Sequence, residues 1–283
     1  MRTIIICDSG LGGLDIAARV LEQIRAAGQF RLVYFNAWPH PACGYNQLRD
    51  DQERQQVFAA ALEGMARFRP NLCLIACNTL SVVYRQIAAI NPAPFPVLEI
   101  VQPASAYFAA ALTREPLLKL LILGTDTTIR SGVYVEQLVK AGISAQRLAS
   151  LACPGLATAL ETSFDSQEVR EKITAAANQA ADIFPADTLL GLALCCTHFG
   201  YAEKIWKETF AARFQIQPQL LNPNACLEIE QARQSGSTQL KVEFFSRFPM
   251  PPDKLSFFAR YFKDKAPELS QALSQAQCDE KLF

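Results

Sequence analysis

Two short segments of this chain place a cysteine at the point where a buried strand gives way to a helix. In the first, the apolar run 72–76 ends in Cys77, Asn78 and Thr79, and residues 81–90 then show helical spacing. A thiol at such a junction lies among backbone N–H groups that have no partner within the helix, and these groups stabilise the thiolate. The thiolate is the basic form of cysteine, so Cys77 is a candidate acid/base group.

The second segment repeats this pattern. Residues 189–195 form another apolar run, which leads directly into Cys196, Thr197 and His198. One of the two histidines in the chain therefore lies two residues beyond a strand-end thiol. A histidine at this distance can exchange a proton with the thiol, because its ordinary pKa lies near neutrality.

The two segments belong to an internal repeat. Cys77 aligns with Cys196, and Cys7 aligns with Gly124, at nearly equal offsets along the chain. Strands alternate with helices in both halves, which is typical of a parallel sheet covered by helices on both faces. Ligands of such sheets bind beyond the C-terminal ends of the strands. We therefore expect an α/β fold with two similar doubly wound parallel-sheet lobes and the active site in the cleft between them.

The proline-rich segment 91–96 breaks helices and marks the expected boundary between the lobes. The predicted lobes are residues 1–98 with 213–283, on the Asp8 and Cys77 side, and residues 99–212, on the Cys196 and His198 side. Near the C-terminus, residues 233–238 predict a turn before a strand at 240–245. The polar tail from residue 264 onward is expected to be loosely held.

The composition excludes several classes of protein. The 283 residues include 27 basic and 27 acidic side chains, without a block of like charge. This balance argues against nucleic-acid binding, which needs a concentrated basic surface. No apolar run approaches the roughly 20 residues that span a bilayer, and the first residues enter a strand-like run without a signal-peptide cleavage site. We expect a cytoplasmic protein that binds neither nucleic acid nor a membrane.

The nine cysteines are expected to be free thiols. Their spacings match no zinc-binding pattern, and their number is odd. Most are expected in the core, because free cysteine is among the most buried residue types. Cys73 and Cys195 lie inside strand runs and are predicted to be core residues of this kind.

If the repeats face one another, their two strand-end sulfurs flank one ligand from opposite sides. Two bases on opposite faces of one carbon can invert its configuration without a cofactor, since one removes the α-proton and the other delivers a proton to the far face. The side chains that suit such a substrate fall into three groups: hydroxyls for its carboxylate on Ser9, Thr79 and Thr197; Asp8 or Asn78 for its ammonium group; and Asp8 and His198 as partners of Cys77 and Cys196.

Structural alternatives exist for these residues. Cys77 could be an ordinary buried strand end, His198 a structural histidine, and Asp8 with Ser9 a simple helix cap. The turn that follows Asp8 is rich in glycine (residues 10–13), which lets a backbone approach an anion at a helix N-terminus. Its spacing does not match the dinucleotide fingerprint, and we prefer a carboxylate site over a phosphate loop.

These motifs resemble the aspartate/glutamate racemase superfamily, and within it glutamate racemase. The matching pieces cover nearly the whole chain: residues 8–13, 76–79, 124–125, 127–129, 152–154 with Glu161, 196–198, and the closing segment 244–262. The resemblance implies two α/β lobes with the C-terminal segment returning to the first. It also implies a cofactor-independent interconversion of L- and D-glutamate that supplies D-glutamate for peptidoglycan, and hence for cell-wall biogenesis and cell shape.

The resemblance further assigns roles to individual residues. Cys77 and Cys196 would be the acid/base pair, assisted by Asp8 and His198. The substrate-binding residues implied by the family pattern are Ser9, Asn78, Thr79, Thr197, Cys43, Gly44, Thr125, Thr128 and Glu161. Neither a metal nor a cofactor is implied, and the expected ligand is a small amino acid. Whether the chain forms a homodimer stays open.

One loop departs from the family pattern. Glutamate racemases usually carry a Pro-Tyr-Gly turn after the second strand, whereas here Ala42, Cys43 and Gly44 stand at that place, with Tyr45 next to them. The loop contributes to substrate binding in the family, so the alternatives include a racemase for aspartate or another acid. A catalytically silent, ligand-binding paralogue is the alternative outside enzymes. A single-cysteine decarboxylase would tolerate the loss of one of the two thiols.

Overall fold

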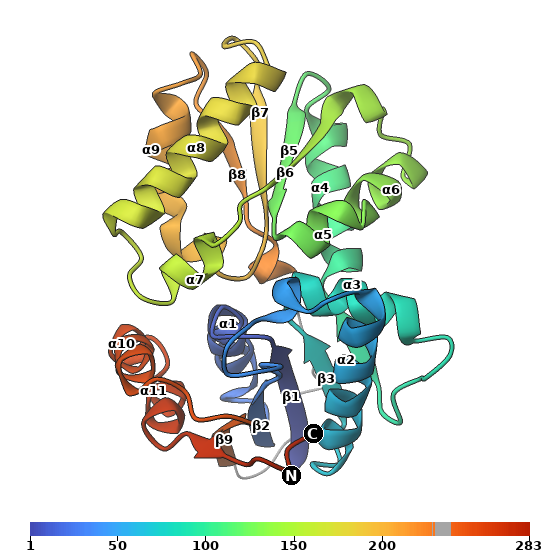
Figure 1. Cartoon of the computed structure of the whole chain (residues 1–283), viewed down its shortest axis with the longest axis vertical. Coiled ribbons are helices and arrows are strands. Elements are labelled where there is room, and N and C mark those ends of the chain that lie inside the picture. Colours follow the sequence, from blue (N-terminus) through green and yellow to red (C-terminus); the bar gives the residue numbers. More distant parts are fainter. Residues whose placement is uncertain (228, 230–238) are drawn as a thin grey trace. The chain divides into compact units, whose positions relative to one another are not determined.

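The computed structural model describes residues 1–227, 229 and 239–283. The predicted turn at 233–238 lies outside the described residues. The chain divides into two compact units, which we call unit 1 (Met1–Ile100 with Leu227–Phe283) and unit 2 (Val101–Cys226). Figure 1 labels most of their helices and strands.

Unit 1 is built on a six-stranded parallel sheet with the strand order β10-β9-β2-β1-β3-β4. Its strands are β1 (Arg2–Asp8), β2 (Gln29–Asn36), β3 (Leu72–Ile75), β4 (Val97–Glu99), β9 (Gln239–Ser246) and β10 (Gln277–Cys278). The central strands are continuous apolar runs because helices cover both faces of the sheet. In register, Asp8 is the partner of Asn36, and Asn36 is the partner of Ser246.

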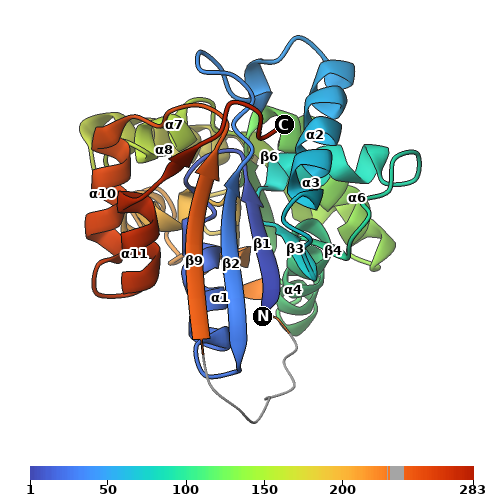
Figure 2. The ribbon, with the colours of Figure 1, turned by 90° about the horizontal axis from the view of Figure 1, so that it is seen from below.

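Helices lie on both faces of this sheet (Figure 2). They are α1 (Leu14–Ile24), α2 (Asp51–Ala66), α3 (Asn78–Ile87), α10 (Pro252–Phe262) and α11 (Pro267–Ser274), with a 3-10 turn, η1, at Tyr45–Gln47. On one face, α2 and α3 pack on β1, β2 and β3 around residues such as Phe35, Phe58 and Leu80. The other face is covered by α1, α10 and α11 (Figure 2).

Unit 2 contains a four-stranded parallel sheet with the order β6-β5-β7-β8. Its strands are β5 (Lys119–Gly124), β6 (Leu148–Ala152), β7 (Leu190–Cys195) and β8 (Gln219–Leu221). Its helices are α4 (Val101–Arg114), α5 (Asp126–Arg130), α6 (Val133–Lys140), α7 (Leu156–Leu160), α8 (Gln167–Ile183) and α9 (Glu203–Ala211). Three short 3-10 turns complete it, η2 (Ala145–Arg147), η3 (Phe199–Ala202) and η4 (Pro223–Cys226). The α7, α8 and α9 side of the sheet packs around the fully buried Trp206.

The two sheets share one topology. The strand order β2-β1-β3-β4 of unit 1 corresponds strand by strand to β6-β5-β7-β8 of unit 2. This confirms the prediction of two similar doubly wound parallel lobes. Cys77 follows β3 and Cys196 follows β7, so the two thiols occupy equivalent places at the C-terminal edges of their sheets.

Two expectations differ from the structure. The predicted division placed residues 213–226 with the first lobe, but β8 pairs with β7 and this segment belongs to unit 2. The prediction of a loosely held tail from residue 264 is wrong. The tail forms α11 and β10, and Leu282 is fully buried.

The end of the chain is anchored by its backbone as well as its side chains. Asp279 N donates to Ser246 O at 3.0 Å, and Arg67 forms an ion pair with Asp279. A Cβ added at Gly64 would lie 2.1 Å from Leu282 O, so α2 needs a glycine where the tail crosses it. The sequence of the tail is polar, yet Leu269, Leu273 and Leu282 are buried, and Leu282 joins the core that contains Phe35 and Phe58.

None of the described helices is long and apolar enough to cross a membrane. Among the residues that the structure describes, no group of three or more histidine, cysteine and acidic side chains is arranged to hold a metal ion.

Candidate active site

The first candidate thiol stands at the start of a regular helix. Cys77 is the residue before α3, and its backbone is extended (φ −66°, ψ 124°), as expected of an N-cap. Ser81 N donates to Cys77 O at 2.9 Å, which starts the helical hydrogen-bond pattern. Its side chain retains 7% exposure, whereas Cys73 inside β3 has none. The prediction of a strand-to-helix thiol at Cys77 and of a core cysteine at Cys73 is confirmed.

Ser9 is the described side-chain partner of this thiol. Its Oγ lies 3.2 Å from Cys77 Sγ, and either atom can donate. Ser9 follows β1, which neighbours β3 in the sheet, so the parallel arrangement brings the two strand ends together. Asn78 and Thr79, in the first turn of α3, are buried beside them.

Asp8 is fully buried at the end of β1 and is held by the glycine turn after it. Gly10 N donates to Asp8 Oδ1 at 3.0 Å, and Tyr34 Oη donates to Gly10 O at 2.8 Å. A Cβ at Gly13 would lie 2.8 Å from Asp8 Oδ2, so glycine is required there by the carboxylate. The glycine turn therefore packs on a protein carboxylate. Tyr34 supports it, a role that its strand position alone did not indicate.

The loop that carries Cys43 and Gly44 follows β2 and makes its described hydrogen bonds locally. Cys43 N donates to His40 O at 3.2 Å, and Gly44 N donates to Gln47 Oε1 at 2.8 Å. Both residues are partly exposed. A Cβ at Gly44 would meet nothing within 4 Å, so this glycine faces open space.

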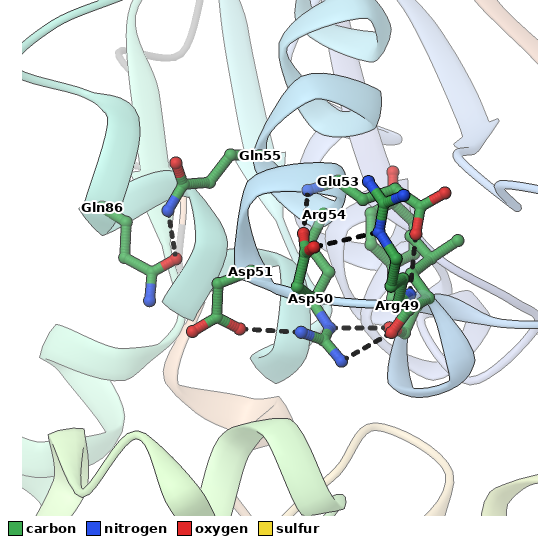
Figure 3. A network of polar contacts seen from close by, with 9 residues as sticks. Arg49, Asp50, Asp51, Glu53, Arg54, Gln55 and Gln86 are labelled. Carbon is green, nitrogen blue, oxygen red and sulfur yellow. Dashed lines mark hydrogen bonds and ion pairs between the residues drawn. The ribbon is translucent and has the colours of Figure 1, made fainter.

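Arg54 fixes the far end of this loop. It is buried in the first turns of α2, and its guanidinium donates to Tyr45 O at 2.9 Å and to Leu48 O at 3.0 Å. Figure 3 shows this arginine within the network at the start of α2, where the Asp50 side chain accepts a hydrogen bond from Glu53 N at 2.8 Å. A buried arginine bonded to two loop carbonyls holds residues 45–48 rigidly.

The second candidate thiol stands in a different kind of turn. Cys196 follows β7 with 6% exposure, while Cys195 inside the strand has none. Phe199 N donates to Cys196 O at 3.0 Å and Tyr201 N donates to His198 O at 3.0 Å, so the chain enters η3 before α9 begins. The predicted core position of Cys195 is confirmed. The helix expected beyond this strand is α9 (Glu203–Ala211), and the 3-10 turn η3 separates it from Cys196.

His198 links Cys196 to a carboxylate. Its Nδ1 lies 3.7 Å from Cys196 Sγ, and its Nε2 lies 3.0 Å from Glu161 Oε1. Burial by itself would lower the pKa of His198, but the hydrogen bonds with Cys196 and Glu161 and the negative charge of these partners raise it to about 10. At neutral pH the ring is therefore an imidazolium, which donates through both nitrogens.

Glu161 was expected among the substrate-binding residues, and the structure places it against His198. It lies just after α7, and the ring of Phe164 stacks on that of Tyr201 with centroids 4.5 Å apart. This stacking holds the segment after α7 against η3, where His198 is located. Sequence spacing could not show the pairing, because 37 residues separate the two partners.

Thr125 and Thr128 lie together at the C-terminal edge of the second sheet. Thr125 caps α5, and its Oγ1 lies 3.1 Å from Thr128 Oγ1. Gly124 ends β5, which pairs with β7, so the threonines are in the unit that carries Cys196. Thr197, the remaining predicted binding residue of this unit, is buried between Cys196 and His198.

The other buried cysteines lack the features of an acid/base group. Burial raises the pKa of Cys7, Cys73 and Cys195 well above the ordinary range, and it raises the pKa of Cys153 to about 12. Thiols in this condition stay protonated at neutral pH and act as small apolar residues. Cys77 and Cys196 are distinguished from them by their contacts with Ser9 and His198.

Comparison with known proteins agrees with this geometry. The model of the Asp/Glu/Hydantoin racemase family matches residues 8–227. The chain belongs to this family. It is accordingly an amino-acid racemase, and thus an isomerase.

Similar proteins within the racemases include a curated glutamate racemase of Limosilactobacillus reuteri, which is 25% identical over 241 residues, or 84% of this chain and 83% of that one. Among solved structures, a glutamate racemase isoform from Bacillus anthracis has a TM-score of 0.69 at 22% identity, over 92% of this chain and 93% of that chain. A glutamate racemase from Francisella tularensis, solved in complex with D-glutamate, has a TM-score of 0.66 at 18% identity, over 98% and 94% of the two chains. These structures share the two-lobe fold.

Proposed function

We propose that this racemase interconverts L- and D-glutamate without a cofactor, by proton transfer at Cα between two cysteines. The observation that carries the proposal is the pair of thiols, Cys77 and Cys196, that follow equivalent strands in two repeated sheets. The proposal requires the two sulfurs to approach the α-carbon from opposite faces. Glutamate is proposed because the similar proteins described above are glutamate racemases.

The reaction can be written as two balanced steps. A thiolate takes the α-proton, so an S–H bond forms as the Cα–H bond breaks and its electron pair stays on carbon. The second cysteine then gives its proton to the opposite face, which forms the new Cα–H bond and leaves a thiolate. The two thiols exchange protonation states in each turnover, and the reverse reaction uses them in the opposite order.

The residues around each thiol are proposed to assist in different ways. His198, an imidazolium held by Glu161, stabilises negative charge on Cys196. On the other side, Asp8 assists Cys77, whose sulfur contacts Ser9. Hydroxyl and amide groups hold the α-carboxylate and ammonium of the substrate, which positions Cα and stabilises the carbanion. The proposed set is Ser9, Asn78, Thr79, Thr125, Thr128 and Thr197, with Cys43 and Gly44 nearest the substrate side chain.

A different acidic substrate is the second candidate, and one observation favours it. The loop after β2 has Cys43, a small and partly exposed side chain, where glutamate racemases usually have tyrosine. Aspartate is the first alternative to test. In a bacterial cell the glutamate reaction would supply D-glutamate for peptidoglycan in the cytoplasm, and cell-wall biogenesis and cell shape would depend on it.

The test is exchange of the α-proton for deuterium, followed by NMR in D2O with L-glutamate, D-glutamate and then aspartate. The proposal predicts exchange with both glutamate enantiomers and a circular-dichroism signal that decays to zero. Exchange with aspartate alone would overturn the choice of glutamate and direct attention to the Cys43 loop. Absence of exchange with both acids, from folded and reduced protein, would overturn the proposal and favour a silent binding protein.

A further inference from the structure

A buried amide from a distant segment contacts the turn that carries Cys196 and His198. Asn224 lies in η4, after β8, and has 1% exposure. Its Nδ2 donates to Thr197 O at 3.1 Å, across 27 residues of sequence. The carbonyl that it holds belongs to the residue between the thiol and the imidazole.

The three successive carbonyls of this turn accept hydrogen bonds from different parts of the chain. Cys196 O and His198 O accept backbone N–H groups within the turn, from Phe199 and Tyr201. The carbonyl of Thr197 accepts a hydrogen bond from the Asn224 side chain, and the loss of a donor from a buried carbonyl is costly. After Cys77, in contrast, the chain enters the regular helix α3, whose own backbone hydrogen bonds fix the turn.

Asn224 is in turn held firmly in place. Its backbone N donates to Asn222 Oδ1 at 3.1 Å, and Asn222 Nδ2 donates to Glu203 Oε1 at 3.1 Å. Gly200 leaves room for this arrangement, because a Cβ there would lie 2.5 Å from Asn222 Nδ2. A continuous set of contacts therefore runs from the start of α9 through η4 to the Thr197 carbonyl.

We propose that Asn224 is a positioning residue for the pair Cys196 and His198. By fixing the peptide between Thr197 and His198, its amide sets the approach of the imidazole to the sulfur. The distance of 3.7 Å between Nδ1 and Sγ is long even for a hydrogen bond to sulfur, so a small rotation of this peptide would break the contact. The inference deepens the proposed function, on which its consequence for turnover rests, but the geometry can be tested without a substrate.

The experiment measures the alkylation rate of Cys196 by iodoacetamide between pH 6 and 10, with mass spectrometry of the Cys196 peptide. The variant Asn224→Leu keeps the approximate size of the side chain and removes the donor. We expect alkylation of Cys196 at neutral pH to slow by about fivefold, the order of one lost hydrogen bond, and its rise with pH to move to higher pH. Cys278, which is exposed in unit 1, serves as the internal reference.

A matched control separates this effect from the loss of any asparagine. Asn178 is an exposed residue of α8 whose Oδ1 accepts a hydrogen bond from Arg213 at 2.9 Å. The variant Asn178→Leu should leave the pH profile of Cys196 unchanged. An unchanged profile in folded Asn224→Leu would overturn the inference. If Asn224→Leu does not fold, Asn224→Ala, which adds no bulk, shows whether the alkylation profile of Cys196 shifts or stays unchanged. Asn224→Gln keeps the amide donor and should restore part of the alkylation rate.

Racemisation supplies the second measurement. Asn224→Leu should lower kcat about as much as the alkylation rate and leave KM nearly unchanged, because the amide holds the turn rather than the substrate. A shifted alkylation profile in a protein without racemase activity would leave the inference standing and contradict the proposed function. Racemisation in the wild-type protein with a kcat that Asn224→Leu does not lower would contradict the inference alone.

Discussion

The turns after β3 and β7 occupy the same place in two sheets that share a four-stranded order, yet they surround their thiols differently. Cys77 contacts the neutral hydroxyl of Ser9. Cys196 contacts the imidazolium of His198, which Glu161 holds from its other side. The repeated fold therefore determines where the thiols stand, and local substitutions determine what stabilises their charge.

The backbones of the two turns differ as well. Cys77 is the N-cap of a regular α-helix, so the sulfur lies at the positive end of the helix dipole. Cys196 begins a 3-10 turn with a side-chain ion pair beside it. In unit 1 the helix terminus is placed to stabilise a thiolate, and in unit 2 a charged side chain is placed to do so.

Replacement of either thiol should have the largest effect. The two-base mechanism predicts that Cys77→Ala and Cys196→Ala each reduce racemisation by roughly 100- to 10,000-fold, the range of a lost general acid or base. The control is Cys278→Ala, at an exposed cysteine. Initial rates by circular dichroism measure the effect. A variant of one of the two thiols that retains full racemisation would show that the two turns are not functionally equivalent.

The second comparison concerns stability, because unit 1 receives the end of the chain in its core. Leu282→Ala removes a fully buried side chain and should lower the free energy of unfolding of unit 1 by about 3 kcal/mol. Leu98→Ala, at an exposed leucine of β4, is the matched control. Urea unfolding can follow each unit separately, since Trp38 reports on unit 1 and Trp206 on unit 2 when the other is replaced by Phe. Equal stability of Leu282→Ala and the control would contradict the anchored tail.

The partners of the two thiols should differ in importance. His198→Gln removes a charged hydrogen-bond donor from Cys196 and is expected to lower kcat by roughly 10- to 100-fold. Ser9→Ala removes a neutral hydroxyl from Cys77 and should cost about fivefold, as for an ordinary hydrogen bond. Steady-state kinetics with both enantiomers provide the measurement. A larger loss from Ser9→Ala than from His198→Gln would reverse the comparison.

The smallest effect is a pH dependence of stability specific to unit 2. The pKa of His198 is raised to about 10 in the folded protein, from the usual value of 6.5. A raised pKa means that its contribution to stability is fully present below pH 6.5 and is lost as the pH rises through 10. The free energy of unfolding of unit 2, followed by Trp206, should therefore be higher in the wild type than in His198→Gln at low pH. This difference should shrink as the pH rises from 6.5 to 10. A constant difference would indicate that His198 is not held as an imidazolium.

Much of the local geometry could be predicted from short segments. The apolar runs before Cys77 and Cys196 predicted buried parallel strands, and the alignment of the two runs predicted similar sheets. The residue types after each strand also indicated which thiols have polar neighbours. Cys73 and Cys195 were correctly expected in the core, because they lie inside the runs.

Contacts between distant segments could not be predicted in this way. The ion pair of Glu161 with His198, the amide of Asn224 on Thr197 and the placement of β8 beside β7 all join residues far apart in the chain. The prediction of a loose tail was wrong for a related reason, since the polar composition concealed three leucines that are buried in the fold, and one of them, Leu282, fits only because α2 has a glycine there. Composition is an average over a segment, whereas the burial of one side chain depends on how it packs against particular neighbours.

The sequence by itself determined that this protein has strand-end thiols in a duplicated α/β framework, because the hydrophobic pattern of each strand and the residues that end it are local properties. Only the tertiary structure decided how each thiol is surrounded. Protonation and orientation depend on burial and on partners from other segments, and these exist only once the chain has folded.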